Sequence, residues 1–549
     1  MPEYLLTVEG MTCERCEEAV EFALRALGAV EPRADHHRGE VRFGFDEDLA
    51  AALGAVRAAG YRPGHLSAQA GGQSGEHGPG SGGRRRDFDF VTVGSGSAAF
   101  AAAIRASNLG AKVAMVEAAT PGGTCVNVGC IPSKALLAAA ETYHRAGHHP
   151  FAGVATAEVG VDVAALVAGK DGIVSDLRSG KYVELAERYG FDIVSGHATF
   201  TGPDRLAVDE GRMLEAGNFL LATGSAPFVP AIPGLEDAGY LTSTTAMALD
   251  RLPGSLVVVG GNYIGLEMGQ LFADLGVEVT IVEAQGRLAP GEEPEVSAWI
   301  SGALADRGVE VLTAASVVGV EPGSPKTVQV EVGGAPRALH TTEILVATGR
   351  RPVLDGLGLD AAGVALDRRG RLVLDGQLRT TNPAIWAAGD VTGGPQFVYV
   401  AAAQGTLAAD NAVGDAAREM DYTVLPRVIF TTPTIAAVGL TEEAARAARY
   451  DCECRVLDLV HVPRARVNRD SRGGVKVVAE RGSGRVLGIS AVADGAGDAI
   501  LAGVYAVKFG LSVADLADTW APYLTMAESV KLAAQTFTTD VAKLSCCAA

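Results

Sequence analysis

The chain has 549 residues, 48% of them hydrophobic, and a formal net charge of −19. This length is too great for one hydrophobic core, so we expect three or more domains. The acidic balance argues against a nucleic-acid surface, and no run approaches the roughly 20 apolar residues of a membrane-spanning helix.

The first residues show no basic region followed by an apolar stretch and no small-residue cleavage site. Nothing there directs the chain to secretion, so we expect a cytoplasmic protein. Its eight cysteines fall into four close pairs, too few for a disulfide scaffold in so long a chain. In a reducing compartment, close pairs indicate metal binding or redox chemistry.

Residues 1–66 are predicted to form a small module. The pattern indicates strands at 4–8, 29–34 and 40–45, helices at 17–27 and 48–59, and a short strand after Gly60. This order predicts a ferredoxin-like βαββαβ sandwich. Cys13 and Cys16, in a loop leading into the first helix, would hold a soft metal ion between two thiolates. Structural zinc is the alternative, but it usually takes four ligands and the module has no second cysteine pair.

Residues 67–86 are rich in Gly and Ser and behave as a flexible linker. The module before them is therefore expected to be tethered to the rest of the chain.

Two glycine-rich fingerprints follow. Strand 88–93 runs into Gly94, Gly96 and Ala99 and then into an Ala-rich helix, and Glu117 closes the next strand. Such turns bring the backbone and a helix N-terminus close to a pyrophosphate, while the acid accepts from a ribose hydroxyl. The sequence predicts a nucleotide-binding domain here.

The second copy begins with strand 256–259, continues through Gly260 and Gly265, and ends with Glu283. The interval from first glycine to acid is 23 residues in both copies, although Asn262 replaces the second glycine. Two copies in register are a strong signal, and a second nucleotide-binding domain is predicted.

Between the fingerprints, residues 122–134 read Gly-Gly-Thr-Cys-Val-Asn-Val-Gly-Cys-Ile-Pro-Ser-Lys. Cys125 and Cys130, at the start of a helix, can close a disulfide or hold one metal ion. The helix dipole and Lys134 would favour a thiolate there.

From residue 425 onward no further fingerprint occurs, and we expect an interface domain. Cys452 and Cys454 alternate within a strand, which favours ordinary packing of both thiols over a metal site. Cys546 and Cys547 are adjacent and cannot easily form a normal disulfide. As two thiolates they could instead capture a soft ion and pass it on.

Residues 87–549 resemble the pyridine nucleotide-disulfide oxidoreductases, and the motif at 122–134 is the main basis of this resemblance. With the flanking cysteine pairs, the whole chain resembles the mercuric reductase group of this family. The resemblance implies an α/β fold with two Rossmann-like nucleotide-binding domains and an α+β dimerisation domain. The implied ranges are a heavy-metal-associated domain at 1–66, the linker at 67–86, an FAD-binding domain at 87–235 and 361–424, an NAD(P)-binding domain at 236–360 and a dimerisation domain at 425–549.

The same resemblance implies cofactor contacts. FAD would lie on the first fingerprint, and NADPH or NADH on the second. The residues implied to bind these cofactors are Gly94, Gly96, Ala99, Glu117, Thr124, Lys134, Ala222, Asp390, Val398, Gly260, Gly265, Glu283 and Gly349.

The implied catalytic roles centre on the cysteines. Cys130 would lie next to the flavin and Cys125 would face the substrate Hg(II), with Lys134 paired to Glu267. Tyr263 would cover the nicotinamide pocket, and Tyr523 would lie near the bound metal. The tail with Cys546 and Cys547 would reach the active site of the other subunit, which implies a homodimer.

One position departs from the disulfide-reducing relatives. Lipoamide and glutathione reductases carry a histidine where this chain has Tyr523, and its last histidine is His461. Dithiol exchange needs a group that titrates near neutral pH, whereas the tyrosine pKa is about 10. We therefore expect reduction of Hg(II) to Hg(0) by NAD(P)H through FAD, for mercury detoxification.

Two alternatives are a dihydrolipoamide- or glutathione-type disulfide reductase and a sequestration protein with a vestigial oxidoreductase body. The absent histidine opposes the first and the intact fingerprints oppose the second. Nucleotide choice stays open: Glu283 suits NADH because a carboxylate repels a 2′-phosphate. Against this, the resemblance implies NADPH, and Arg287 nearby could assist a phosphate.

Overall fold

The computed structural model describes residues 3–11, 14–45, 49–69, 86–156, 160–209, 211–414, 416–540 and 543. The chain divides into two compact units, Met1–Arg85 and Arg86–Ala549. Cys13, Cys546 and Cys547 lie outside the described residues.

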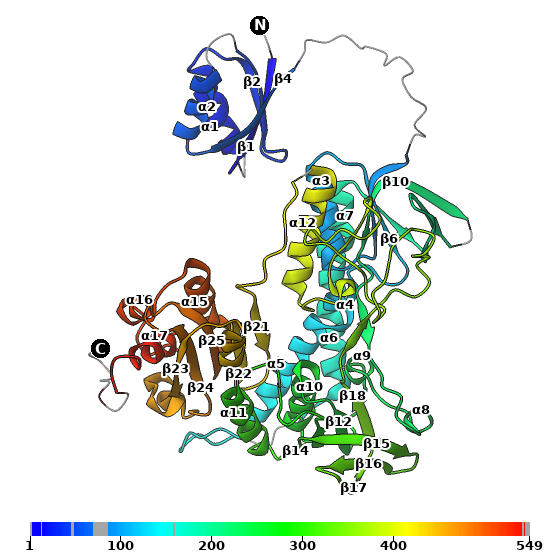
Figure 1. Cartoon of the computed structure of the whole chain (residues 1–549), viewed down its shortest axis with the longest axis vertical. Helices are drawn as coiled ribbons and strands as arrows, with labels where there is room; N and C mark the ends of the chain where they lie inside the picture. Colours follow the sequence, from blue (N-terminus) through cyan, green and yellow to red (C-terminus); the bar gives the residue numbers. More distant parts are fainter. Residues whose placement is uncertain are drawn as a thin grey trace. The chain divides into compact units, whose positions relative to one another are not determined.

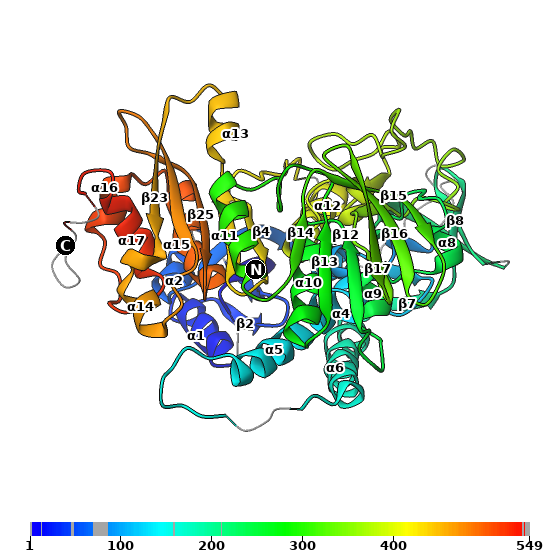
Figure 2. The same ribbon diagram turned by 90° about the horizontal axis from the view of Figure 1, so that it is seen from below.

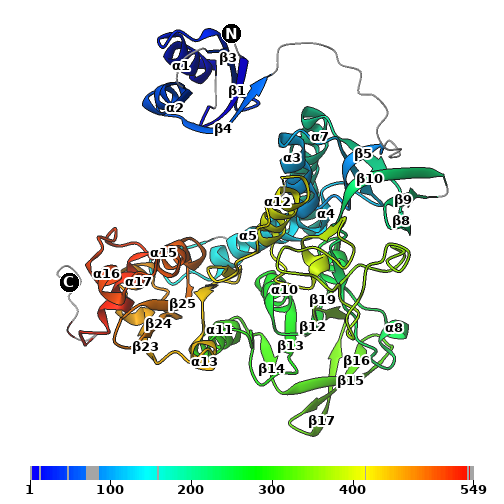
Figure 3. The same cartoon turned by 45° about the horizontal axis from the view of Figure 1, so that its top comes forward.

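The first unit has the predicted ferredoxin-like βαββαβ order. Its antiparallel sheet has the strand order β2-β3-β1-β4, and both helices cover one face (Figures 1 and 3). Leu6, Val20 and Phe43 are buried between sheet and helices. The first helix begins at Glu14, so Cys16 lies in its first turn and not in the preceding loop. The elements are β1 (Glu3–Glu9), α1 (Glu14–Arg25), β2 (Val30–Asp35), β3 (Glu40–Gly44), α2 (Leu49–Ala58) and β4 (Arg62–Gln69).

The second unit begins with a sheet of strand order β7-β6-β5-β10-β9-β8, and β20 pairs with β10. The strands β7, β6, β5, β10 and β20 are parallel, and β8 and β9 form an antiparallel extension. Helices α3 and α12 lie side by side (Figures 1 and 3). The elements are β5 (Phe88–Val93), α3 (Ser97–Asn108), β6 (Val113–Glu117), β7 (Asp192–Ser195), β8 (Ala198–Gly202), β9 (Arg205–Val208), β10 (Arg212–Leu221), β20 (Ile385–Ala387), η2 (Asp390–Thr392) and α12 (Val398–Gly414).

A second parallel sheet, of order β14-β13-β12-β18, carries the second fingerprint. Its central strand, Leu-Val-Val-Val after Ser255, is buried, as expected for a parallel strand covered on both faces. A three-stranded antiparallel sheet, β15-β16-β17, belongs to the same region. The elements are β12 (Ser255–Val259), α10 (Tyr263–Asp274), β13 (Glu278–Val282), α11 (Pro294–Ala305), β14 (Glu310–Leu312), β15 (Ala315–Glu321), β16 (Lys326–Val332), β17 (Ala335–Thr341) and β18 (Glu343–Val346).

The remaining helices of these two regions lie in the chain either between β6 and β7 of the first sheet or between β10 of the first sheet and β12 of the second, and one short two-stranded ribbon accompanies them. The helix α5 carries Cys130 at its first position and packs against α10 of the second nucleotide-binding fold. The elements are α4 (Gly123–Val128), α5 (Cys130–Gly147), α6 (Val163–Arg178), the π-helix η1 (Ser179–Val183), α7 (Glu184–Tyr189), β11 (Ser225–Pro227), α8 (Leu235–Ala238), α9 (Ser243–Ala246) and β19 (Arg350–Pro352), which pairs with β11.

The last part is an antiparallel sheet of order β21-β22-β25-β24-β23 with helices α15, α16 and α17 beside it (Figure 2). Helix α11 of the nucleotide-binding region contacts β25 of this sheet. The elements are β21 (Pro426–Ile429), β22 (Thr434–Gly439), α13 (Glu442–Ala447), β23 (Cys452–Asp458), η3 (Leu459–His461), α14 (Pro463–Asn468), β24 (Gly474–Glu480), β25 (Val486–Ala493), α15 (Ala496–Phe509), α16 (Val513–Asp518) and α17 (Glu528–Gln535). Within the described ranges, no helix combines the length and apolar character needed to cross a membrane.

The second fingerprint depends on close backbone contact at Gly265. A Cβ atom there would lie 1.8 Å from the carbonyl oxygen of Gly260, which belongs to the backbone and cannot swing aside. The helix α10 can therefore approach the turn only because residue 265 has no side chain.

We expect Gly265→Ala to lower the stability of the second nucleotide-binding domain by about 1–3 kcal/mol, because the added methyl group forces the helix and the turn apart. Differential scanning calorimetry of the full chain measures this effect. The matched control is Gly302→Ala on the neighbouring helix α11, where a Cβ atom meets nothing within 4 Å. That variant should gain up to about 1 kcal/mol. Equal behaviour of the two variants would contradict the prediction.

Candidate active site

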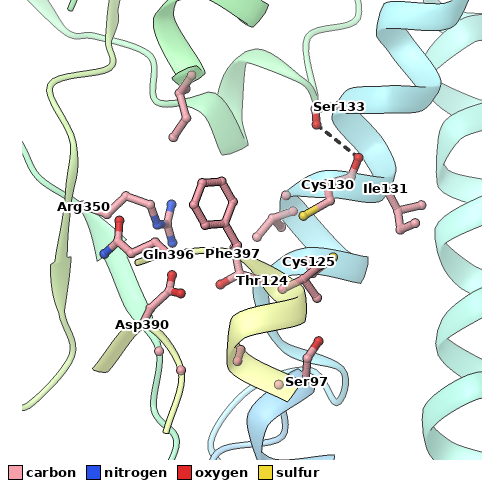
Figure 4. A pocket seen from close by; sticks show the side chains of 18 of the residues that line it. Ser97, Thr124, Cys125, Cys130, Ile131, Ser133, Arg350, Asp390, Gln396 and Phe397 are labelled. Carbon is pink, nitrogen blue, oxygen red and sulfur yellow. Dashed lines mark hydrogen bonds between the residues drawn. The ribbon is translucent and has the colours of Figure 1, made fainter. Parts of the chain in front are cut away.

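A cavity of about 500 Å³ opens where the two nucleotide-binding folds meet. Its lining is predominantly apolar, with a few charged groups set into it. Figure 4 shows Cys125 and Cys130 on one wall, Arg350 and Asp390 on the opposite wall, and Phe397 between them. Predicted site residues that line the cavity are Gly96, Thr124, Cys125, Cys130, Lys134, Ala222, Tyr263, Glu267, Asp390 and Val398.

Two glycines place the cysteine wall. Gly129 separates α4 from α5, and a Cβ atom there would lie 2.9 Å from the carbonyl oxygen of Thr124. Gly123 has a φ angle of 65° and packs so tightly that its Cβ would lie 2.5 Å from Gly96 Cα. The loop that carries Cys125 therefore rests directly against the first fingerprint turn.

The two thiols form an asymmetric pair. Neither is in a disulfide, and the Cys125 thiol donates a hydrogen bond to Cys130. That hydrogen bond, with help from the charge of Lys134, lowers the pKa of Cys130 to about 7, against the opposing effect of burial. The same interaction and burial raise the pKa of Cys125 well above its ordinary value. Near neutral pH the pair can therefore hold one thiolate, on Cys130, and one thiol, on Cys125.

Glu267 ties the cysteine wall to the rest of the unit. Lys134 Nζ lies 2.7 Å from Glu267 Oε2, and the backbone N–H of Phe430 donates to Glu267 Oε1 at 3.0 Å. The Lys134 ammonium also lies 4.6 Å from the centroid of the Phe430 ring. One carboxylate thus joins α5, α10 and the segment after β21.

Tyr263 is held by a carboxylate behind it. Its hydroxyl donates to Glu292 Oε1 at 3.1 Å, and Glu292 also accepts from Arg427 Nε at 2.9 Å. Burial is the main cause that raises the pKa of Tyr263, and the negative charge of Glu292 adds to it. The ring packs edge-on against Phe397, which in turn stacks on Tyr399 at 5.3 Å. Tyr263 is therefore a neutral donor in an aromatic wall.

The opposite wall is built around Ser225. Its hydroxyl donates to Asp390 Oδ2 at 2.6 Å, and Arg350 Nε donates to the same hydroxyl at 2.8 Å. Burial lowers the pKa of Arg350, although Asp390 opposes this. Arg350 directly follows Gly349, one of the residues implied to bind a cofactor, whereas Ser225 carried no signal in the sequence, because its role depends on the β11–β19 ribbon.

The residues around the first fingerprint fit an FAD. Gly94 has a φ angle of 104°, and a Cβ there would lie 2.3 Å from Ala222 O, so the turn lies against the end of β10. No side chain caps the start of α3, which leaves its first N–H groups for a phosphate. Glu117, at the end of β6, can accept from a ribose hydroxyl, and Asp390 faces the cavity.

The remaining predicted residues lie outside this cavity. Gly94, Ala99 and Glu117 belong to the first fingerprint, and Gly260, Gly265 and Glu283 to the second, while Gly349 precedes β19. Tyr523 is not among the cavity residues of its own chain; its side chain is 50% exposed.

Sequence reasoning missed part of the wall. Phe397, Tyr399 and Phe430 line the cavity, and Glu292 and Arg427 support it from behind. None of these residues belongs to a recognisable motif, because only the packing of three separate chain segments brings them together.

No group of three or more His, Cys, Asp or Glu side chains in the described part of the chain is arranged to hold a metal ion. The Cys125–Cys130 pair therefore offers a two-thiol site.

Cys452 and Cys454 lie together on β23 in a small apolar cluster with Val478 and Leu487, and burial raises the pKa of Cys454 to about 12. This environment agrees with the prediction of ordinary strand packing.

Comparison with known proteins assigns most of the chain. A family model described as pyridine nucleotide-disulphide oxidoreductase matches residues 88–405, and the dimerisation domain of that family matches residues 425–534. A mercuric reductase from Streptomyces lividans is 53% identical over 467 residues, covering 84% of this chain and 98% of the relative. A mercuric reductase from Staphylococcus aureus is 45% identical over 547 residues, covering 99% of each. Among solved structures, the Cu(II) complex of the HOCl-induced flavoprotein disulfide reductase RclA from Escherichia coli matches with a TM-score of 0.74 and 31% identity, over 83% of this chain and 100% of that one.

The charges around Cys130 predict two opposite pKa changes. Lys134→Met should raise the Cys130 pKa above 7, because a stabilising positive charge is lost, and Glu267→Gln should lower it, because a repelling negative charge is lost. The thiolate forms as pH rises through the pKa, so its ultraviolet absorbance in the reduced protein reports the midpoint. A Cys130→Ala control should lack this transition. Shifts of the same sign in the two variants would contradict the electrostatic account.

Proposed function

The chain belongs to the pyridine nucleotide-disulphide oxidoreductase family and, within it, to the mercuric reductases, and on that premise we propose how its residues carry out the reaction. It is an FAD-containing enzyme that reduces Hg(II) to Hg(0) with NAD(P)H. The balanced reaction is Hg(II) plus NAD(P)H giving Hg(0), NAD(P)+ and H+.

The observation that carries this assignment at the level of the site is a thiol–thiolate pair in a cavity without an acid–base histidine. Tyr523, which would complete the cavity of the other subunit, stands where the disulfide-reducing relatives carry a histidine, and the last histidine of the chain is His461. Disulfide exchange needs a group that takes up and releases protons near neutral pH, whereas two-electron reduction of a metal ion does not. The disulfide reductase alternative is therefore not favoured.

Cys125 and Cys130 would hold Hg(II) between two sulfur atoms, since soft thiolates are its preferred protein ligands. The Cys130 thiolate would bind first, and loss of the Cys125 proton would complete the site. FAD, when bound, supplies the two-electron chemistry that links the nicotinamide to the metal. Lys134 would keep positive charge beside Cys130, and Glu267 would hold Lys134 in place.

Tyr263 would cover the nicotinamide. Its hydroxyl is fixed by Glu292, and its ring continues the aromatic wall of Phe397 and Tyr399, which excludes water from one side of the cavity. Exclusion of water strengthens the electrostatic interactions inside such a site.

A second subunit would complete the site. The dimerisation domain supports a homodimer, and the segment with Tyr523 exposes Trp520 to 95%. In that dimer, Tyr523, Cys546 and Cys547 of one subunit would serve the cavity of the other. Cys13 and Cys16 would collect the ion from small thiols. Each transfer would exchange one thiolate at a time, so Hg(II) is never released as a free ion.

The proposed setting is the cytoplasm, because the reaction consumes NAD(P)H and requires cysteines that stay reduced.

The first experiment is anaerobic NAD(P)H oxidation by the FAD-loaded protein with HgCl2 and excess thiol, with Hg(0) trapped from the gas phase. Lipoamide and oxidised glutathione serve as parallel substrates. We expect mercury-dependent oxidation with stoichiometric Hg(0) and little turnover of either disulfide. Rapid disulfide reduction without Hg(0) would overturn the assignment.

The proposed role of Cys546 and Cys547 predicts that their loss impairs mercury turnover without impairing reduction of the flavin. Cys546→Ala/Cys547→Ala should lower mercury turnover in excess thiol at least roughly tenfold, because the ion can no longer be handed to the inner pair by ligand exchange. Reduction of the flavin by NAD(P)H, followed by stopped flow, should be unchanged. Cys452→Ala/Cys454→Ala, which removes two thiols from the strand β23, is the matched control and should retain turnover.

A further inference from the structure

The strand-end carboxylates of the two fingerprints accept hydrogen bonds from the same two chain positions, although one donor is a side-chain hydroxyl in the first and a backbone N–H in the second. In the first, Glu117 accepts from the Ser95 hydroxyl at 2.5 Å and from the N–H two residues on, at Ala119, at 2.7 Å. In the second, Glu283 accepts from the Gly261 N–H at 2.6 Å and from the N–H two residues on, at Gln285, at 2.7 Å. Ser95 and Gly261 each directly follow the first glycine of their turns. The two carboxylates therefore occupy equivalent places.

This equivalence bears on the ribose that each carboxylate meets. The adenosine ribose of FAD carries free hydroxyls and no 2′-phosphate, so the arrangement around Glu117 suits an unmodified diol. Glu283 is held at the equivalent place and is only 7% exposed, so its carboxylate has little freedom to move away from the end of β13. A buried carboxylate at this place accepts hydrogen bonds from a diol and repels a phosphate.

Arg287 is the cationic residue nearest to Glu283 in the sequence, and its guanidinium already makes two hydrogen bonds. Arg287 Nη1 donates to the carbonyl oxygen of Glu292 at 2.8 Å, and Nη2 donates to that of Pro290 at 2.7 Å. The guanidinium therefore braces the loop that carries Glu292, the residue that holds Tyr263. Ala284, Gln285 and Gly286, which directly follow Glu283, are exposed and offer neither a cation nor a hydroxyl.

We propose that Glu283 makes this enzyme select NADH over NADPH. Arg287 holds the loop that carries Glu292 and does not bind the 2′-phosphate of NADPH. This inference rests on the proposed function only in taking a nicotinamide nucleotide as the reductant. A 2′-phosphate would bring a charge of about −1.5 to −2 against the Glu283 carboxylate. Because like charges in contact discriminate strongly, we expect a preference of roughly 100-fold.

Isothermal titration calorimetry of the oxidised, FAD-loaded full chain tests this preference without any turnover. The probes are ADP-ribose and 2′-phospho-ADP-ribose, which differ only at the 2′ position. We expect ADP-ribose to bind roughly 100-fold more tightly. A preference below about tenfold, or tighter binding of the phosphorylated probe, overturns the proposal.

Variants assign the preference to its residue. Glu283→Gln removes the charge and should reduce the ratio of the two dissociation constants at least about tenfold. The matched control, Glu278→Gln, makes the same charge change at the exposed opposite end of β13 and should leave the ratio unchanged. Arg287→Gln should affect both probes equally; selective loss of the phosphorylated probe would make Arg287 a phosphate receptor and overturn the proposal.

Failure of this inference is distinguishable from failure of the proposed function. Stopped-flow reduction of the flavin by NADH and by NADPH, without mercury, gives the nucleotide preference on its own. Faster reduction by NADPH at equal low concentration would overturn the inference while Hg(0) production stood. Absence of Hg(0) with both nucleotides would overturn the proposed function while the binding preference stood.

Discussion

The ion pair between Lys134 and Glu267 is the constraint on which the site depends. Lys134 lies one turn after Cys130 on α5, and Glu267 lies on α10, so their 2.7 Å contact sets the distance between the cysteine wall and the second nucleotide-binding fold. Glu267 is almost fully buried and also accepts from the Phe430 N–H, which brings in the dimerisation domain. The Lys134 side chain is 32% exposed, so solvent screens the pair in part, but loss of Lys134 would leave the buried Glu267 carboxylate without its cation. The three domains therefore meet with little freedom at the reacting thiols.

Two further buried clusters hold the same interface. Lys476, on β24, lies 3.0 Å from Glu293 and from Glu295 and 2.9 Å from Glu442. Arg427 pairs with Glu292 at 2.9 Å. Both cations come from the dimerisation domain, and most of their partners come from the loop and helix after β13. The loop that follows Glu283 is thus fixed to the dimerisation domain, and through Glu292 it reaches Tyr263.

The division of labour between the thiols follows from their surroundings. Cys130 sits at the start of α5, near Lys134, and receives the Cys125 hydrogen bond, so its charged form is stabilised despite burial. Cys125 lies in the preceding short helix, where its interaction with Cys130 and burial raise its pKa. In the proposed mechanism, a soft metal ion would bind the Cys130 thiolate first and so remove the negative charge that favours the Cys125 proton. The second thiolate would then form on the same ion.

The sequence by itself determined the elements whose chemistry is local: both glycine fingerprints, the cysteine motif at 122–134, and the βαββαβ order of the first unit. These follow from turns, helix starts and strand alternation, which involve residues close together in the chain. Only the tertiary structure decided how Glu267, Phe430, Tyr263 and Glu292 combine around the cysteines. The contacts of Glu267 span 133 and 163 residues, and Glu292 joins Tyr263 to Arg427, which is 135 residues further along the chain. The tertiary structure also decided that Arg287 donates to backbone carbonyl oxygens of its own loop and that Glu283 occupies the place equivalent to that of Glu117. Hydrogen bonds with backbone groups cannot be recognised from the residue pattern.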